Sequence, residues 1–134
     1  MSIPSIFYVS TEDQASEMEM NHDLAQEDVA ELGGIDTLKL STLYAIAIKR
    51  EWDVDLMDTF SEVRTSDSEW IYEIPKEFTK ELEGTDLDAA SAEWAETEEM
   101  ACEPEDAKYV IDVLLRMAKR SEETGKPLYI YTTL

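Results

Sequence analysis

The residues best placed to do chemistry are six carboxylates in residues 94–107, a stretch without any basic side chain. On a helix, carboxylates three positions apart lie on one side and can share a metal ion. The row with this spacing is Glu93, Glu96, Glu99 and Glu103. Carboxylate di-iron bundles also need Glu-x-x-His pairs, and the only histidine, His22, lies far away in the sequence. The pattern therefore predicts a hydrated helix face opposite a buried Trp94, with no metal and no cofactor.

A second group of acids, Asp53, Asp55 and Asp58, has the spacing of a calcium-binding loop. An EF-hand loop that begins at Asp53 needs glycine at its sixth position and glutamate at its twelfth. The chain has Asp58 and Arg64 at those positions, so the match fails. We interpret these acids as residues at the start of a helix.

Nucleophilic catalysis finds little support in the sequence. Cys102 is the only cysteine, and the carboxylates around it raise the pKa of a thiol and so suppress the reactive thiolate. We expect Cys102 to be a small buried residue. His22 is expected to cap or precede a helix, and no partner for it as a general base can be named. An enzyme of unassigned chemistry stays open as an alternative, without any catalytic residue.

The net charge of −21 is unevenly distributed along the chain. Residues 1–38 hold nine acids and no Lys or Arg, and residues 77–107 hold twelve acids against Lys80 alone. Residues 39–76 and 108–134 are closer to balance. Such a charge repels nucleic acid and anionic membranes and attracts basic proteins. Direct nucleic-acid binding and membrane binding are therefore not expected.

The acidic block 77–107 allows two interpretations beyond solubility. A helix with acids on every turn resembles the charge spacing of duplex DNA, which predicts a DNA- or RNA-mimicking inhibitor of a nucleic-acid-binding protein. The same face could instead bind a basic protein partner, with electrostatic attraction accelerating the encounter. Trp52, in a charged segment, is the aromatic residue expected at the surface as an anchor. The predicted partner-binding residues are Glu81, Asp88, Glu93, Glu96, Glu99, Glu103 and Trp52.

Helical periodicity, helix caps and the few glycines and prolines locate the expected helices. They are residues 23–32, 36–51, 75–83, 85–100 and about 104–123. In the fourth helix one face is expected to carry Leu87, Ala90, Trp94 and Ala101. In the last helix the buried face is expected to carry Tyr109, Val110, Val113, Leu114 and Met117.

Strand patterns are fewer. Residues 60–74 predict a hairpin, because a Ser-Asp-Ser turn precedes alternating apolar and acidic residues. Residues 127–133 are apolar on both faces and rich in β-formers, which is typical of an inner strand. Residues 5–9 form a further candidate strand. The expected fold is α+β, mostly helical, with a small antiparallel sheet.

The length of 134 residues fits one domain, 1–134. A single thiol suits a reducing compartment, and no signal peptide or long apolar run is present, so a cytoplasmic location is expected. The leading interpretation is a non-catalytic interaction domain that binds a basic protein partner.

Overall fold

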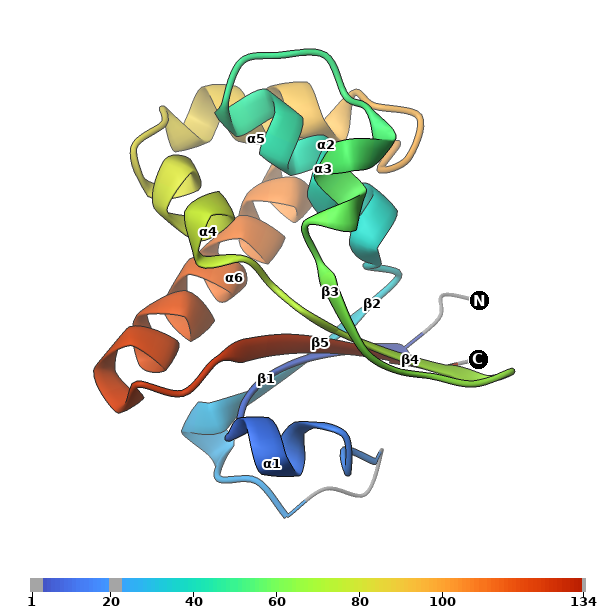
Figure 1. Ribbon diagram of the computed structural model, residues 1–134. Coiled ribbons are helices and arrows are strands. Elements are labelled where there is room, and N and C mark those ends of the chain that lie inside the picture. Colours follow the sequence, from blue (N-terminus) through green and yellow to red (C-terminus); the bar gives the residue numbers. More distant parts are fainter. Residues whose placement is uncertain (1–3, 20–22, 134) are drawn as a thin grey trace.

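The computed structural model describes residues 4–19 and 23–133 (Figure 1). Within these residues five strands form one antiparallel sheet in the order β2-β1-β5-β4-β3. The strands are β1 (Pro4–Val9), β2 (Val29–Gly33), β3 (Ser61–Thr65), β4 (Glu69–Glu73) and β5 (Leu128–Thr133). The sheet thus brings the beginning, the middle and the end of the chain together.

Most of the helical structure lies on one side of this sheet (Figure 1). That layer contains α2 (Thr37–Ala47), α3 (Val54–Asp58), α4 (Lys76–Glu83), α5 (Leu87–Ala95) and α6 (Pro104–Thr124). The short α1 (Glu12–Ala15) lies on the opposite side, and a 3-10 turn, Gln26–Asp28, leads into β2. In the part of the chain that the structure describes, no helix is both long and apolar enough to cross a bilayer.

The central strand β5 shows why the sheet has a core on both faces. Leu128 and Ile130 join the large apolar cluster beneath the helices, whereas Tyr129 and Tyr131 join a smaller cluster on the α1 side. Alternate residues of a strand point to opposite faces, so an inner strand covered on both sides must be apolar throughout. The expectation of an inner strand at 127–133 is confirmed.

Trp94 occupies the centre of the helical layer and is fully buried. It packs in the same cluster as Phe78 of α4 and Leu114 of α6. Its indole N–H donates to the carbonyl oxygen of Lys39 in α2 at 2.9 Å, which satisfies the one polar atom of the side chain. The prediction that Trp94 belongs to the core is confirmed.

Other elements also agree with the sequence. The 60–74 hairpin is β3 and β4, whose turn is closed by a hydrogen bond from the Glu69 N–H to the Ser66 hydroxyl at 3.1 Å. The strand at 5–9 is β1, and Asp36 caps α2 by accepting the Lys39 N–H at 2.9 Å. The α+β class is confirmed, although five strands make the sheet larger than expected.

Three expectations about helices were wrong. Residues 23–32 are not a helix, because residues 29–33 pair with β1 and tertiary pairing overrides local periodicity. The helix expected at 85–100 ends at Ala95, so Ala101 is exposed outside it. Tyr109 is 61% exposed, because the buried face of α6 runs through Ala107, Val110 and Ile111 and leaves Tyr109 on its solvent side.

Candidate functional site

The acidic residues predicted to bind a partner do not form one helical row. Glu81 lies on α4, and Asp88 and Glu93 lie on α5. Glu81 and Glu93 line one hollow with Lys49 and Lys80, at the C-terminal end of α2. Asp88 instead accepts a hydrogen bond from the exposed ammonium of Lys108 on α6 at 2.9 Å. These carboxylates therefore face different neighbours, which include the three cations Lys49, Lys80 and Lys108.

The remaining predicted acids, Glu96, Glu99 and Glu103, lie in the segment between α5 and α6, where the expected helix is interrupted. The Thr97 hydroxyl donates to the Trp94 carbonyl at 2.6 Å, and Ala101 adopts a left-handed backbone with φ 42°. Pro104 also disfavours helical backbone at the residue before it. The prediction of a helical glutamate row is therefore wrong.

One residue of this segment, Cys102, nevertheless lies close enough to Lys39, near the start of α2, for their charges to interact. Burial and the carboxylate of Asp106 raise the pKa of the Cys102 thiol, and the ammonium of Lys39 opposes them. Cys102 is half-buried and packs against the main apolar cluster, so the expectation of a fully buried thiol is only partly met. Among Glu96, Glu99 and Glu103, it is the charge of Glu103 that also raises the pKa of this thiol.

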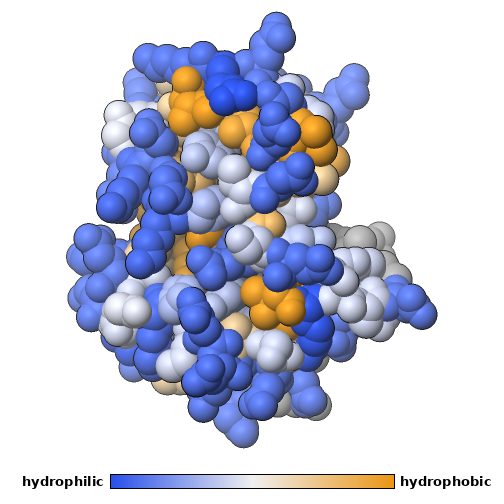
Figure 2. Space-filling model, viewed as in Figure 1, coloured by the Kyte–Doolittle hydropathy of each residue, from blue (hydrophilic) through white to orange (hydrophobic). Residues whose placement is uncertain are grey.

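Apolar side chains are exposed at this same end of the molecule. Trp52 is 42% exposed, and its indole N–H donates to the Ser41 hydroxyl at 2.8 Å. Ser41 in turn donates to the carbonyl of Leu38, one turn earlier in α2. Leu38, Trp52 and Val54 are three exposed large apolar residues, which we name the α2 patch. Figure 2 shows apolar groups interrupting an otherwise hydrophilic surface over α2 and α3.

Next to the patch is a groove of about 490 Å³, which we name the α2 groove. It lies between residues 34–39 and the helix-facing side of β4 and β5, and Leu38 belongs to both the patch and the groove. Its sheet side is formed by Trp70, Tyr72, Ile130 and Thr132. A mostly apolar concave surface with a few polar groups is typical of a binding site.

The charges around the patch are mainly negative. Residues 51–58 hold four acids and no base. Arg50 donates to Asp53 at 2.7 Å, and this hydrogen bond, together with backbone N–H groups, holds the pKa of that carboxyl below its usual value. Asp53 also caps α3 by accepting the Asp55 N–H at 2.8 Å, which confirms its expected place at a helix start. The patch is thus apolar with an acidic surround.

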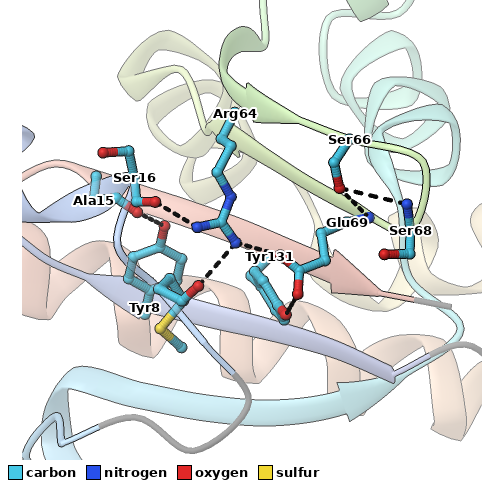
Figure 3. Close-up of polar contacts among 9 residues, drawn as sticks. Tyr8, Ala15, Ser16, Arg64, Ser66, Ser68, Glu69 and Tyr131 are labelled. Atoms are coloured by element: carbon cyan, nitrogen blue, oxygen red, sulfur yellow. Dashed lines mark hydrogen bonds and ion pairs between the residues drawn. The ribbon is translucent and has the colours of Figure 1, made fainter.

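A separate group of polar contacts lies on the α1 side of the sheet (Figure 3). Arg64 donates to the carbonyls of Ser16 and Met18, at 2.5 and 2.9 Å, and pairs with Glu69 at 2.6 Å. Tyr131 donates to the same carboxylate at 3.0 Å. Arg64 donates to two backbone carbonyls of the segment after α1 and to the carboxylate of Glu69. We therefore interpret this group as structural, because it holds that segment over the sheet.

Residues suited to metal binding are not brought together in the part of the chain that the structure describes. In residues 4–19 and 23–133 there is no group of three or more His, Cys, Asp or Glu side chains placed to hold a metal ion. His22, expected near a helix start, lies outside the described residues. The described residues therefore offer the α2 patch and its groove as the candidate site, and this site is suited to binding.

Comparison with protein-family models, with curated proteins and with solved structures finds no match to this chain. The functional argument therefore depends on the geometry alone.

Among the residues of the candidate site, the sequence predicted the surface position of Trp52 but did not predict the groove. Leu38, Trp70 and Tyr72 look like ordinary core or sheet positions in a linear pattern. They are partly exposed because they lie where the N-terminal end of α2 meets two strands that are distant in sequence. A signal was present in the run 51–55, where Trp52 and Val54 alternate with acids.

Proposed function

We propose that this protein is a non-catalytic interaction module that binds a basic segment of a protein partner at the α2 patch and groove. The observation that carries the proposal is the exposure of Trp52 beside Leu38 and Val54 within an acidic surround. Exposed apolar groups rimmed by charge are typical of protein-binding surfaces, and tryptophan is enriched among residues that dominate binding energy. A basic partner follows from the net charge of −21.

The acids Glu96, Glu99 and Glu103 have a supporting role in this proposal. Glu103 lies beside Cys102, which is within electrostatic range of Lys39, so its charge helps to attract a basic partner toward the α2 end. Glu96 and Glu99 add to the negative charge of the same segment. Glu81, Asp88 and Glu93 lie farther along α4 and α5 and contribute to the long-range field. The proposal includes a cytoplasmic location, which the single thiol of Cys102 favours.

The alternative prediction, nucleic-acid mimicry, assumed a continuous helix that spaces the acidic charges. This helix is absent beyond Ala95, where α5 ends. Mimicry stays a prediction that the same experiments address. The enzyme alternative also stays open, with no assigned residue.

The first experiment is a calorimetric titration with a blocked helical peptide made of leucine and lysine. Trp52→Ala should weaken binding about tenfold, the scale of a residue that dominates an interface. Tyr109→Ala is the matched control, because Tyr109 is also an exposed aromatic residue but lies on α6. Equal affinity of both variants would mean that the peptide binds the acidic surface without a defined site.

The second experiment identifies the partner by capture from cells, with wild type, Trp52→Ala and Tyr109→Ala as baits. The account expects a basic protein that wild type and Tyr109→Ala retain and Trp52→Ala loses. Capture of a nucleic-acid-binding protein that duplex DNA displaces would favour mimicry instead. Capture that Trp52→Ala leaves unchanged would contradict docking at the α2 patch.

A further inference from the structure

The α2 groove has two aromatic rings on one wall. Trp70 and Tyr72 are two residues apart in β4, so both point to the helix-facing side of the sheet. Their cross-strand partners in β5, Thr132 and Ile130, line the groove beside them. Both rings are half-buried, which leaves part of each ring open to the groove.

Two carboxylates flank these rings. Asp36 lines the groove at the start of α2, and Glu62 of β3 is the cross-strand partner of Tyr72. Burial and the charge of Glu62 raise the pKa of the Tyr72 hydroxyl. Lys39 also lines the groove, but its ammonium donates to the Gly34 carbonyl. The two charged residues that line the groove, Asp36 and Lys39, balance each other, and Glu62 beside Tyr72 adds one negative charge, on a molecule of net charge −21.

Aromatic faces and carboxylates attract cations together. The face of an indole or phenol ring carries negative potential, and a cation within about 6 Å of it is stabilised. The guanidinium of arginine suits such a groove better than an ammonium does, because it is planar, weakly hydrated and able to stack on a ring while it donates sideways. A groove of about 490 Å³ has room for this side chain.

We propose that the α2 groove binds an arginine side chain of the basic partner segment, stacked against Trp70 and Tyr72 and held by Asp36 and Glu62. This inference rests on the proposed function and specifies its partner: the segment carries an arginine for the groove next to an apolar residue for the α2 patch. Leucine or lysine in the groove are the competing occupants.

The test uses the whole protein and three blocked tripeptides with a central arginine, lysine or leucine between glycines. Binding is followed through the indole N–H resonance of Trp70 in NMR titrations. The arginine peptide should shift this resonance with a dissociation constant about threefold or more below that of the lysine peptide, because ring stacking favours guanidinium. The leucine peptide should shift it least.

Variants that remove one charge but keep the size of the side chain show which carboxylates contribute to arginine binding. Asp36→Asn keeps a residue that caps helices well, and it should weaken the arginine peptide about threefold, as Glu62→Gln should. Asp112→Asn, on the exposed side of α6, removes the same charge far from the groove and should leave the affinity unchanged. Trp70→Leu, in which binding is followed through the backbone amide resonance of Tyr72 instead, should abolish the preference for arginine over lysine.

Tighter binding of the leucine peptide, or arginine-induced shifts that avoid Trp70 and Tyr72, would overturn the inference. So would equal losses in Asp36→Asn, Glu62→Gln and Asp112→Asn. If the leucine–lysine peptide still depends on Trp52 in these cases, the proposed function stands and only the arginine assignment fails. If that dependence is also absent, both fail.

Discussion

Two tryptophans contact α2 from different parts of the chain, and their surroundings differ completely. The indole N–H of Trp94 donates to the Lys39 carbonyl at 2.9 Å, and that of Trp52 donates to the Ser41 hydroxyl at 2.8 Å. Trp94 is fully buried, whereas Trp52 is 42% exposed. Each indole N–H thus donates to an acceptor in the first half of α2, but only Trp94 is fully covered by protein.

We interpret this difference in exposure as a difference in role: Trp94 stabilises the fold, and Trp52 is proposed to bind a partner. Trp94 has apolar neighbours from α4 and α6, so removing it leaves a cavity in the core. Trp52 precedes α3 in an acidic segment and is held in place by a hydrogen bond. An aromatic side chain that is held in place but partly exposed contributes less to folding than a buried one. Less conformational entropy is lost when such a side chain binds a partner.

The largest expected effect is on the buried side of the comparison. Trp94→Ala should lower the free energy of unfolding by about 3–5 kcal/mol, the range for large aromatic truncations in cores. Trp94→Phe keeps most of the packing, loses the bond to Lys39, and should cost clearly less. Chemical denaturation measures both. A loss below about 1 kcal/mol for Trp94→Ala would place Trp94 outside the core.

A second structural contact extends the comparison to the α1 side of the sheet. Arg64→Met should cost about 1–3 kcal/mol, because it removes charged hydrogen bonds to Ser16, Met18 and Glu69. Hydrogen exchange in residues 11–19 should accelerate in this variant. Arg116→Met, on the exposed side of α6, is the matched control. Unchanged exchange would show that Arg64 does not hold this segment.

On the exposed side of the comparison, the effect on stability should be small. Trp52→Ala should lower the free energy of unfolding by less than about 1 kcal/mol, the usual scale for surface changes. The same denaturation assay measures it beside Trp94→Ala. A cost near that of Trp94→Ala would give Trp52 a structural role and remove the contrast between the two residues.

The smallest expected effect concerns pH. Burial and the charges of Glu12 and Glu77 raise the pKa of Glu73, against the opposing charge of Lys76. A carboxyl with a raised folded pKa binds protons more tightly when folded, so its contribution to stability is lost as pH rises through that pKa. Glu73→Gln should therefore gain less stability than wild type between pH 7 and pH 5. An identical pH dependence of the denaturation midpoint would contradict this.

These residues show which parts of the fold and of the candidate site could be predicted from the sequence. The core position of Trp94 and the surface position of Trp52 were predicted correctly, one by helical spacing and the other by its charged neighbours. The strands at 5–9, 60–74 and 127–133 were also predicted, because β-formers and turn residues are local signals. The α+β class follows from these elements.

The errors have two physical causes. Residues 29–33 carry a helix-like pattern but pair with β1, and the glutamates after Ala95 carry a helical spacing that Thr97 and Pro104 interrupt. The α2 groove joins residues 34–39 to strands from elsewhere in the sequence. Contacts between distant segments decide the first and the third case, and periodicity does not record such contacts; the second is a local interruption by Thr97 and Pro104.

The central claim is that the α2 patch, rather than the acidic surface as a whole, receives the basic partner. Hydrogen exchange measured with and without the leucine–lysine peptide tests it most directly. The account predicts protection concentrated in residues 36–41 and 51–55, weakening with added salt because exposed charges are screened over about 10 Å at 0.1 M. Protection confined to residues 81–93, or spread evenly over the acidic surface, would contradict it.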